Sequence, residues 1–149
     1  MSRYQLERML ATRIAPASRA WRQLGDETLA ELRVSNSTGW CLVYMDRLGP
    51  DVRQIDLART IGISQPSLVR LLHQLEASGL IERQPDPDDR RTNRVLLTDQ
   101  GRELAASIEQ RLGAMRNDLL HDVSDADIRA ALHVCETLSR RIAERRAQP

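Results

Sequence analysis

The sequence predicts a mainly α-helical protein with one small β-hairpin, and three observations lead to this fold class. Two short amphipathic stretches joined by a glycine, QIDLARTI and SQPSLVRLL with the intervening GI, fit a helix, a tight turn and a second helix. Just after them, LIERQ and RVLLT bracket a charged tip, as the strands of a hairpin do. The stretches on both sides repeat apolar residues at helical intervals. We therefore expect a winged helix-turn-helix flanked by dimerisation helices.

Length and composition are compatible with one compact unit. The chain has 149 residues, of which 41% are hydrophobic, and this content is sufficient for a core. Its start, MSRYQLERMLATR, has no signal-type apolar stretch, and no apolar run approaches the roughly 20 residues that span a bilayer. We therefore expect a cytoplasmic protein with no membrane partner. Cys41 and Cys135 lie far apart in helical contexts, so reduced thiols are expected.

The overall charge gives only weak support for a nucleic-acid partner. The net charge is +1, which produces no broad basic field. All 22 of the lysine and arginine residues are arginines, and the planar guanidinium suits phosphates and base edges better than an ammonium does. A simple composition bias would look the same.

Two helices are expected before the helix-turn-helix. The first covers about residues 3–24, with Pro16 perturbing its apolar run. The second, from Ser35 to Leu48, begins with capping residues and stops at a Gly-Pro pair. Its apolar positions at helical spacing are Trp40, Val43, Tyr44 and Leu48.

The first helix of the helix-turn-helix is expected to bury a stripe formed by Ile55, Ala58 and Ile61. Gly62 then takes the positive-φ position that ends the helix. Ser64 can cap the second helix by accepting a hydrogen bond from a first-turn amide. One face of this second helix is apolar and carries Leu68, Leu71, Leu72 and Leu75.

The opposite face of the second helix is polar, with Arg70 and Gln74 among its residues. In a helix-turn-helix the N-terminal residues of this helix enter the major groove, where small side chains permit close approach and the helix N-terminus favours phosphate. We therefore predict DNA contacts from Ser64, Gln65, Pro66, Ser67 and Arg70. A solvated helix face is the alternative.

The tip of the expected hairpin, PDPDDRRTN, carries both charges in nearly equal number. A carboxylate beside an arginine can orient its guanidinium, and a narrow minor groove attracts an inserted arginine. We therefore predict DNA contacts from Asp89, Arg90, Arg91 and Arg94. A solvated charged loop is the alternative.

Two more helices are expected after the hairpin, the first from Thr98 and the second after Ser124 and Asp127, which fit a capping box. Both carry apolar stripes that the small winged domain cannot cover, so helices of the N-terminal segment and of a second copy are expected to cover them. The expected parts are an N-terminal dimerisation helix (1–34), a winged helix-turn-helix (35–101) and C-terminal dimerisation helices (102–149).

The stretches QIDLARTIGISQPSLVRLLHQLEASGLIERQ and DDRRTNRVLLTDQGREL resemble the MarR family of bacterial transcription regulators, and within it the SlyA branch. The wing signature of that family is matched by Asp89, Arg91, Val95, Leu97, Thr98 and Gly101. The resemblance implies a homodimer on a pseudo-palindromic double-stranded DNA operator. It places the recognition-helix residues Gln65, Pro66, Ser67 and Arg70 toward bases and Arg91 in the minor groove. We expect such a regulator to be a repressor.

Many members of this family respond to small aromatic acids, which implies an effector site. Arg19 and Arg22 lie one turn apart on the first helix, so both could face a carboxylate. Trp40 and Tyr44 lie one turn apart on the next helix and could hold a ring between them. With Thr38, these are the expected ligand-binding residues for an aromatic carboxylate that releases the DNA. The alternative is that the arginines are solvated and the rings belong to the core.

Other functions have less support in the sequence. A thiol switch through Cys41 is the regulatory alternative, although an apolar setting usually makes a thiol inert. A winged-helix module that binds protein instead of DNA is compatible with the near-neutral charge. Catalysis is not expected, and neither is a metal or another cofactor. The three histidines His73, His121 and His133 are dispersed, and no glycine-rich phosphate loop or metal-ligand spacing occurs.

Overall fold

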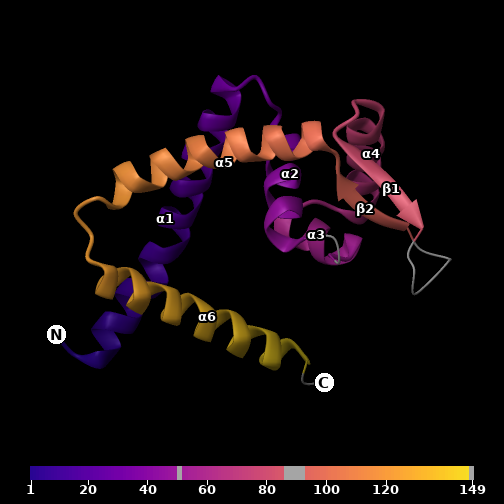
Figure 1. The fold of residues 1–149 in the computed structure, drawn as a ribbon. Coiled ribbons are helices and arrows are strands. Elements are labelled where there is room, and N and C mark those ends of the chain that lie inside the picture. Colours follow the sequence, from indigo (N-terminus) through magenta and orange to yellow (C-terminus); the bar gives the residue numbers. More distant parts are fainter. Residues whose placement is uncertain (50–51, 86–92, 148–149) are drawn as a thin grey trace. The chain divides into compact units, whose positions relative to one another are not determined.

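The computed structural model describes residues 1–49, 52–85 and 93–147 and confirms the predicted fold class (Figure 1). Six helices and one antiparallel hairpin are present in these ranges. In chain order they are α1 (Arg3–Glu31), α2 (Asn36–Leu48), α3 (Gln54–Ile61), α4 (Gln65–Ala77), β1 (Ile81–Pro85), β2 (Asn93–Leu97), α5 (Asp99–Leu120) and α6 (Asp125–Ala147). Within these ranges, no helix combines the length and apolar character needed to cross a membrane.

The chain divides into two compact units, Met1–Met115 and Arg116–Pro149, and the boundary falls inside α5. The first unit contains α1 to β2 and most of α5, and therefore holds the whole helix-turn-helix and the paired strands of the hairpin. The second unit contains the end of α5 and α6.

Helix α1 is longer than the sequence predicted, because it continues past Leu24 to Glu31 and runs through Pro16 without ending. The extension packs against α2 at two glycines. A Cβ added at Gly25 would lie 2.7 Å from Cζ2 of Trp40, and one added at Gly39 would lie 2.5 Å from Cδ2 of Leu29. Close approach of the two helices therefore depends on residues without side chains, a feature that the apolar periodicity did not reveal.

Helix α2 lies at the centre of the first unit. Its buried residues are Gly39, Trp40, Cys41, Leu42, Val43 and Met45. The prediction that Leu48 belongs to its apolar face is wrong, since that side chain is 48% exposed. The predicted stripe was too narrow because elements pack on several sides of this helix, whereas an amphipathic surface helix is covered on one side only.

The helix-turn-helix forms as predicted. Gly62 adopts the left-handed conformation (φ 84°, ψ 32°) and ends α3, and the amides of Gly62 and Ile63 both donate to the carbonyl of Ala58 at 2.9 and 3.0 Å. The predicted core stripe of α3 is wrong at one position, because Ile55 is 45% exposed and Leu57 is 2% exposed. The true inward face is Leu57, Ala58 and Ile61.

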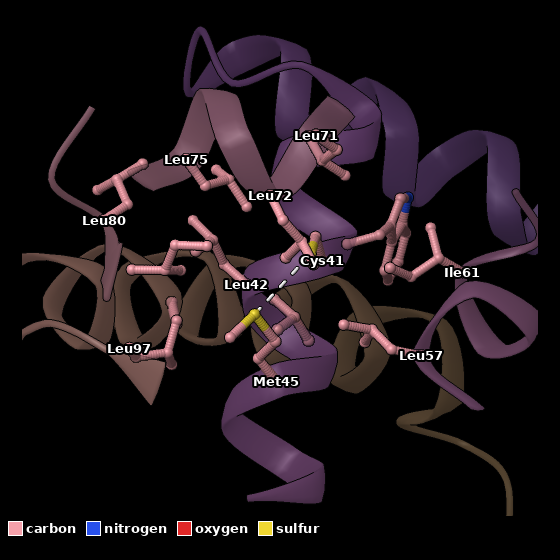
Figure 2. Close-up of a cluster of buried hydrophobic side chains, with 14 of the residues drawn as sticks. Cys41, Leu42, Met45, Leu57, Ile61, Leu71, Leu72, Leu75, Leu80 and Leu97 are labelled. Atoms are coloured by element: carbon pink, nitrogen blue, oxygen red, sulfur yellow. Dashed lines mark hydrogen bonds between the residues drawn. The ribbon is translucent and has the colours of Figure 1, made fainter. Parts of the chain in front are cut away.

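Every helix and strand of the first unit contributes to its core, and Figure 2 shows the part formed by α2, α3, α4 and the hairpin. The four leucines predicted for the inner face of α4 are all buried: Leu68, Leu71, Leu72 and Leu75. Ile81 and Leu97, which pair across the hairpin, are buried as well. The hydroxyl of Thr98 donates to the carbonyl of Gly79 at 2.6 Å and joins the end of the hairpin to the turn after α4.

The hairpin is regular where the structure describes it. Strands β1 and β2 pair antiparallel from Ile81 with Leu97 to Pro85 with Asn93. The tip between them, residues 86–92, lies outside the described residues. Behind the hairpin, a Cβ at Gly101 would collide with the carbonyl oxygen of Leu80, so this position accepts only glycine without rearrangement.

The second unit, taken by itself, exposes apolar residues. None of the residues of α6 is buried, and Leu132, Leu138 and Ile142 are 55%, 38% and 50% exposed. The amide of Asp127 donates to Oγ of Ser124 at 3.2 Å, which confirms the predicted cap. In a full capping box the Asp127 side chain would accept a hydrogen bond from the backbone amide of Ser124. Here Oδ2 of Asp127 accepts instead from the Ser124 hydroxyl, at 2.6 Å.

Candidate DNA-binding surface and effector site

The N-terminal end of α4 places three of the predicted DNA-contacting residues in one chain of hydrogen bonds. The amide of Ser67 donates to Oγ of Ser64 at 3.3 Å, and the Ser64 hydroxyl donates to the Ser67 hydroxyl at 2.9 Å. Nη2 of Arg70 donates to Oγ of Ser67 at 3.5 Å. The cap of the helix and its first long basic side chain are therefore held on one side of α4.

Gln65 and Pro66 lie exposed in the first turn beside this chain. Proline is tolerated there because a first-turn amide has no intrahelical acceptor. The amide of Ser67 donates to the Ser64 side chain and that of Leu68 to the Ser64 carbonyl, and the positive end of the helix as a whole favours anionic groups such as phosphate. The end of α4 can therefore approach a polyanion closely.

Two residues on the exposed face of α4 were missed by the sequence reasoning. Val69 is 40% exposed and His73 is exposed. Val69 and His73 lie four and eight residues after Gln65, so all three share one face of the helix. This spacing could have identified them from the sequence. An exposed apolar side chain on a face that enters the major groove can contact a thymine methyl group.

The base of the hairpin is connected to α4 through Arg83. Its Nε lies 3.1 Å from Oε2 of Glu76, an ion pair whose geometry falls short of a hydrogen bond. Arg94 on β2 faces Gln84 across the ladder and is half-buried. The predicted contacts Asp89, Arg90 and Arg91 lie outside the described residues, so their roles remain predictions.

Three of the five predicted effector residues come together where α1 meets α2. The guanidinium carbon of Arg22 lies 4.2 Å from the centroid of the Trp40 ring, and the rings of Trp40 and Tyr44 stack with their centroids 6.0 Å apart. The two rings contact each other and leave no slot between them. Arg19 is exposed on α1 and Thr38 is half-buried at the start of α2, and neither takes part in these ring contacts.

Asp26 is a central member of this group that the sequence reasoning missed. Its Oδ1 accepts a hydrogen bond from the indole Nε1 of Trp40 at 2.7 Å and lies 3.6 Å from Nε of Arg22. Arg47 extends the group, with its guanidinium 5.9 Å from the Tyr44 ring and an ion pair of 2.6 Å to Glu109. Asp26 stands one turn after Arg22, so an i,i+4 pairing was the available signal.

A pocket of about 500 Å³ opens elsewhere in the first unit, between the end of α2, the hairpin and the start of α5. Its lining includes the carboxylates of Asp46, Glu82 and Asp99 and none of the predicted effector residues. Within the described part of the chain, no three histidine, cysteine or acidic side chains are grouped as a metal site would require.

Cys41 is fully buried, and its Sγ donates to Sδ of Met45 at 3.9 Å (Figure 2). Desolvation by burial raises the pKa of this thiol to about 12. Because the thiolate is the nucleophile in thiol oxidation, a thiol with this pKa is poorly suited to sense peroxides near neutral pH.

Comparison with known proteins identifies the family. The MarR family model matches residues 34–92. The chain is 30% identical to transcriptional regulator PA3341, with a TM-score of 0.82 over 91% of this chain and 98% of that one. It is 26% identical to the transcriptional repressor CouR bound to a 23-mer DNA duplex (TM-score 0.69; 93% of this chain, 98% of that one). It is 25% identical to a mutant of S. aureus MepR bound to an oligodeoxyribonucleotide (TM-score 0.56; 94% and 98%).

The chain therefore belongs to the MarR family and is a transcription regulator of the winged-helix type. Two of the similar structures contain bound DNA, which is the partner that the capped end of α4 suits chemically.

The raised pKa of Cys41 gives a testable prediction for thiol chemistry. In the folded protein, alkylation of Cys41 by iodoacetamide at pH 8 should be at least about 100-fold slower than in urea, because both burial and the scarcity of thiolate protect it. Mass spectrometry of peptides after timed labelling measures both rates. Similar rates in the folded and unfolded protein would restore Cys41 as a candidate sensor.

Proposed function

We propose that this chain is a homodimeric repressor that binds a pseudo-palindromic DNA operator and releases it when a small aromatic carboxylate binds. The observation that carries the DNA-binding part is the exposed end of α4, where Ser64, Ser67 and Arg70 are linked by hydrogen bonds on a helix whose other face is buried. The DNA-bound relatives support the same partner. The resemblance to the SlyA branch remains part of this proposal.

In this proposal α4 enters the major groove with its N-terminal end. The DNA backbone and nearby base edges are contacted by Ser64, Gln65, Pro66 and Ser67, because small serine and proline side chains allow the helix to come close. Arg70 reaches a guanine, whose O6 and N7 accept two hydrogen bonds from one guanidinium. Val69 adds an apolar contact with a thymine methyl group.

The wing completes the proposed DNA contacts. Arg91 enters the minor groove, and Asp89 orients its guanidinium from the same tip. Arg90 and Arg94 contribute contacts to phosphates, which position a protein on the duplex without specifying sequence.

Exposed apolar side chains near both ends of the chain support the homodimer. Leu6 and Leu10 on α1 are 48% and 43% exposed, and α6 exposes Leu132 and Ile142 by 55% and 50%. Long helices with such stripes are rarely left in water, and a second copy offers the same stripes in return. Two copies would present two α4 helices to two half-sites.

For the effector, the proposed site is the group around Arg22 and Trp40. The Arg22 side chain is 40% exposed and that of its partner Asp26 is 31% exposed, so an incoming carboxylate can reach the arginine and compete with Asp26 for it. The aromatic part of the ligand would pack beside the stacked rings of Trp40 and Tyr44, with Arg19 and Thr38 at the margin.

The role of Arg70 is tested with a duplex that the wild-type protein selects from a random pool. Arg70→Ala should cost about 1 to 3 kcal/mol of binding free energy and relax the preference at one guanine, as expected for a bidentate contact. Titration against the selected duplex and against versions with each guanine replaced measures this. Arg8→Ala, which removes an exposed arginine on the side of α1 opposite Leu6 and Leu10, is the control and should change neither quantity. An equal loss of affinity for all sequences would reduce Arg70 to a phosphate contact.

The effector site is tested by thermal unfolding with benzoate, salicylate and 4-hydroxycinnamate. A ligand of the native state at about 100 times its Kd adds about 2.7 kcal/mol of stability, which raises Tm by about 5 °C or more in a protein of this size. The shift should be lost in Arg22→Gln and kept in Arg8→Gln, which replaces an exposed arginine of the same helix on the side opposite Leu6 and Leu10. An undiminished shift in both Arg19→Gln and Arg22→Gln would place the ligand elsewhere.

A further inference from the structure

Arg22 contacts three different helices of the first unit through one guanidinium. On its own helix, α1, Nε lies 3.6 Å from Oδ1 of Asp26. On α2, the ring of Trp40 lies against the guanidinium at 4.2 Å. On α3, Nη2 donates a long hydrogen bond of 3.5 Å to the carbonyl oxygen of Ile61. Asp26 also fixes the Trp40 ring through the indole hydrogen bond, so the arginine and its stacking partner are held by one carboxylate.

The carbonyl of Ile61 occupies a sensitive place in the helix-turn-helix. Ile61 is the last residue of α3, and Gly62 and Ile63 lead directly to Ser64, the cap of α4. The last carbonyls of a helix have no intrahelical donor and carry its negative partial charge, so a guanidinium there stabilises the helix end. The position of this helix end determines how α4 leaves the turn.

We infer that Arg22 is a positioning residue for operator binding: it fixes the end of α3 against α1 and α2 and thereby sets the orientation of α4. This inference rests on the proposed function and adds a role that the effector site alone does not require. It also gives the effector a physical route to the DNA, because a carboxylate that draws Arg22 toward itself weakens the contact with Ile61.

A guanidinium suits this task because its planar face can stack on Trp40 while separate N–H groups point to Asp26 and to the Ile61 carbonyl. Glutamine at this position loses the charge and the stacking cation. Lysine keeps the charge but has no planar face to stack on the Trp40 ring, so its compact ammonium cannot reproduce the stacked position from which Arg22 reaches Asp26 and the Ile61 carbonyl. Both variants should therefore loosen the end of α3 without opening the leucine core beneath α4.

Two measurements test the inference on the full-length chain without added effector. The first compares the affinity for the selected duplex with the affinity for a duplex of equal length and scrambled sequence. Binding to the scrambled duplex depends on charge and not on the orientation of α4. Arg22→Gln should bind the selected duplex about 5- to 10-fold more weakly, with scrambled binding unchanged. Amide hydrogen exchange without DNA should accelerate at residues 61–64 and stay unchanged at the buried leucines of α4.

Arg8→Gln is the matched control, since it removes the same charge from an exposed position of α1 on the side opposite Leu6 and Leu10, and it should leave affinity and exchange unchanged. Arg22→Lys is the second variant and should show the same losses as Arg22→Gln in smaller measure. Wild-type preference and wild-type exchange in both Arg22 variants would overturn the inference. Faster exchange throughout the first unit in both variants would overturn it too, because Arg22 would then serve stability alone. If no duplex can be selected, the proposed function fails, and the exchange at residues 61–64 still decides the role of Arg22.

Discussion

The burial of the leucine face of α4 is the constraint on which the rest of the structure depends. Leu68 and Leu72 are fully buried, and α4 shares its core with α2 and the hairpin. Each such side chain contributes roughly 1.5 to 3 kcal/mol when it leaves water. A helix held by one face can turn only its other face outward, and that face begins with Ser64 and carries Arg70. The hydrophobic packing therefore selects which residues are available for DNA.

Much of this arrangement could be predicted from the sequence because it is encoded over short distances. The cap at Ser64, the positive-φ glycine at Gly62 and the leucine spacing of α4 each depend on residues within two turns, and all three are confirmed. The errors arose where packing between distant segments decides. Leu57 is buried in place of Ile55, and α1 continues to Glu31 because α2 covers it at Gly25.

The candidate effector site shows the same division between local and distant information. Spacing along each helix brought out Arg22 and Trp40 separately, but no local pattern indicated that the arginine would lie on the ring. The contact with Ile61, 39 residues away in the chain, was beyond any periodicity argument. One guanidinium consequently lies between the place proposed for a ligand and the helix end that precedes α4. In this account no long pathway is needed between effector and operator, since the ligand would bind Arg22 and Arg22 contacts the end of the helix that precedes α4.

The most direct test of the account is hydroxyl-radical footprinting of the selected duplex combined with sedimentation of the complex. The account predicts two protected half-sites whose centres lie about one helical turn, roughly 10 base pairs, apart or at a multiple of that spacing. It also predicts two chains per duplex, because each α4 occupies one half-site. A single protected half-site with one chain bound, or protection that is the same on every sequence, would contradict it.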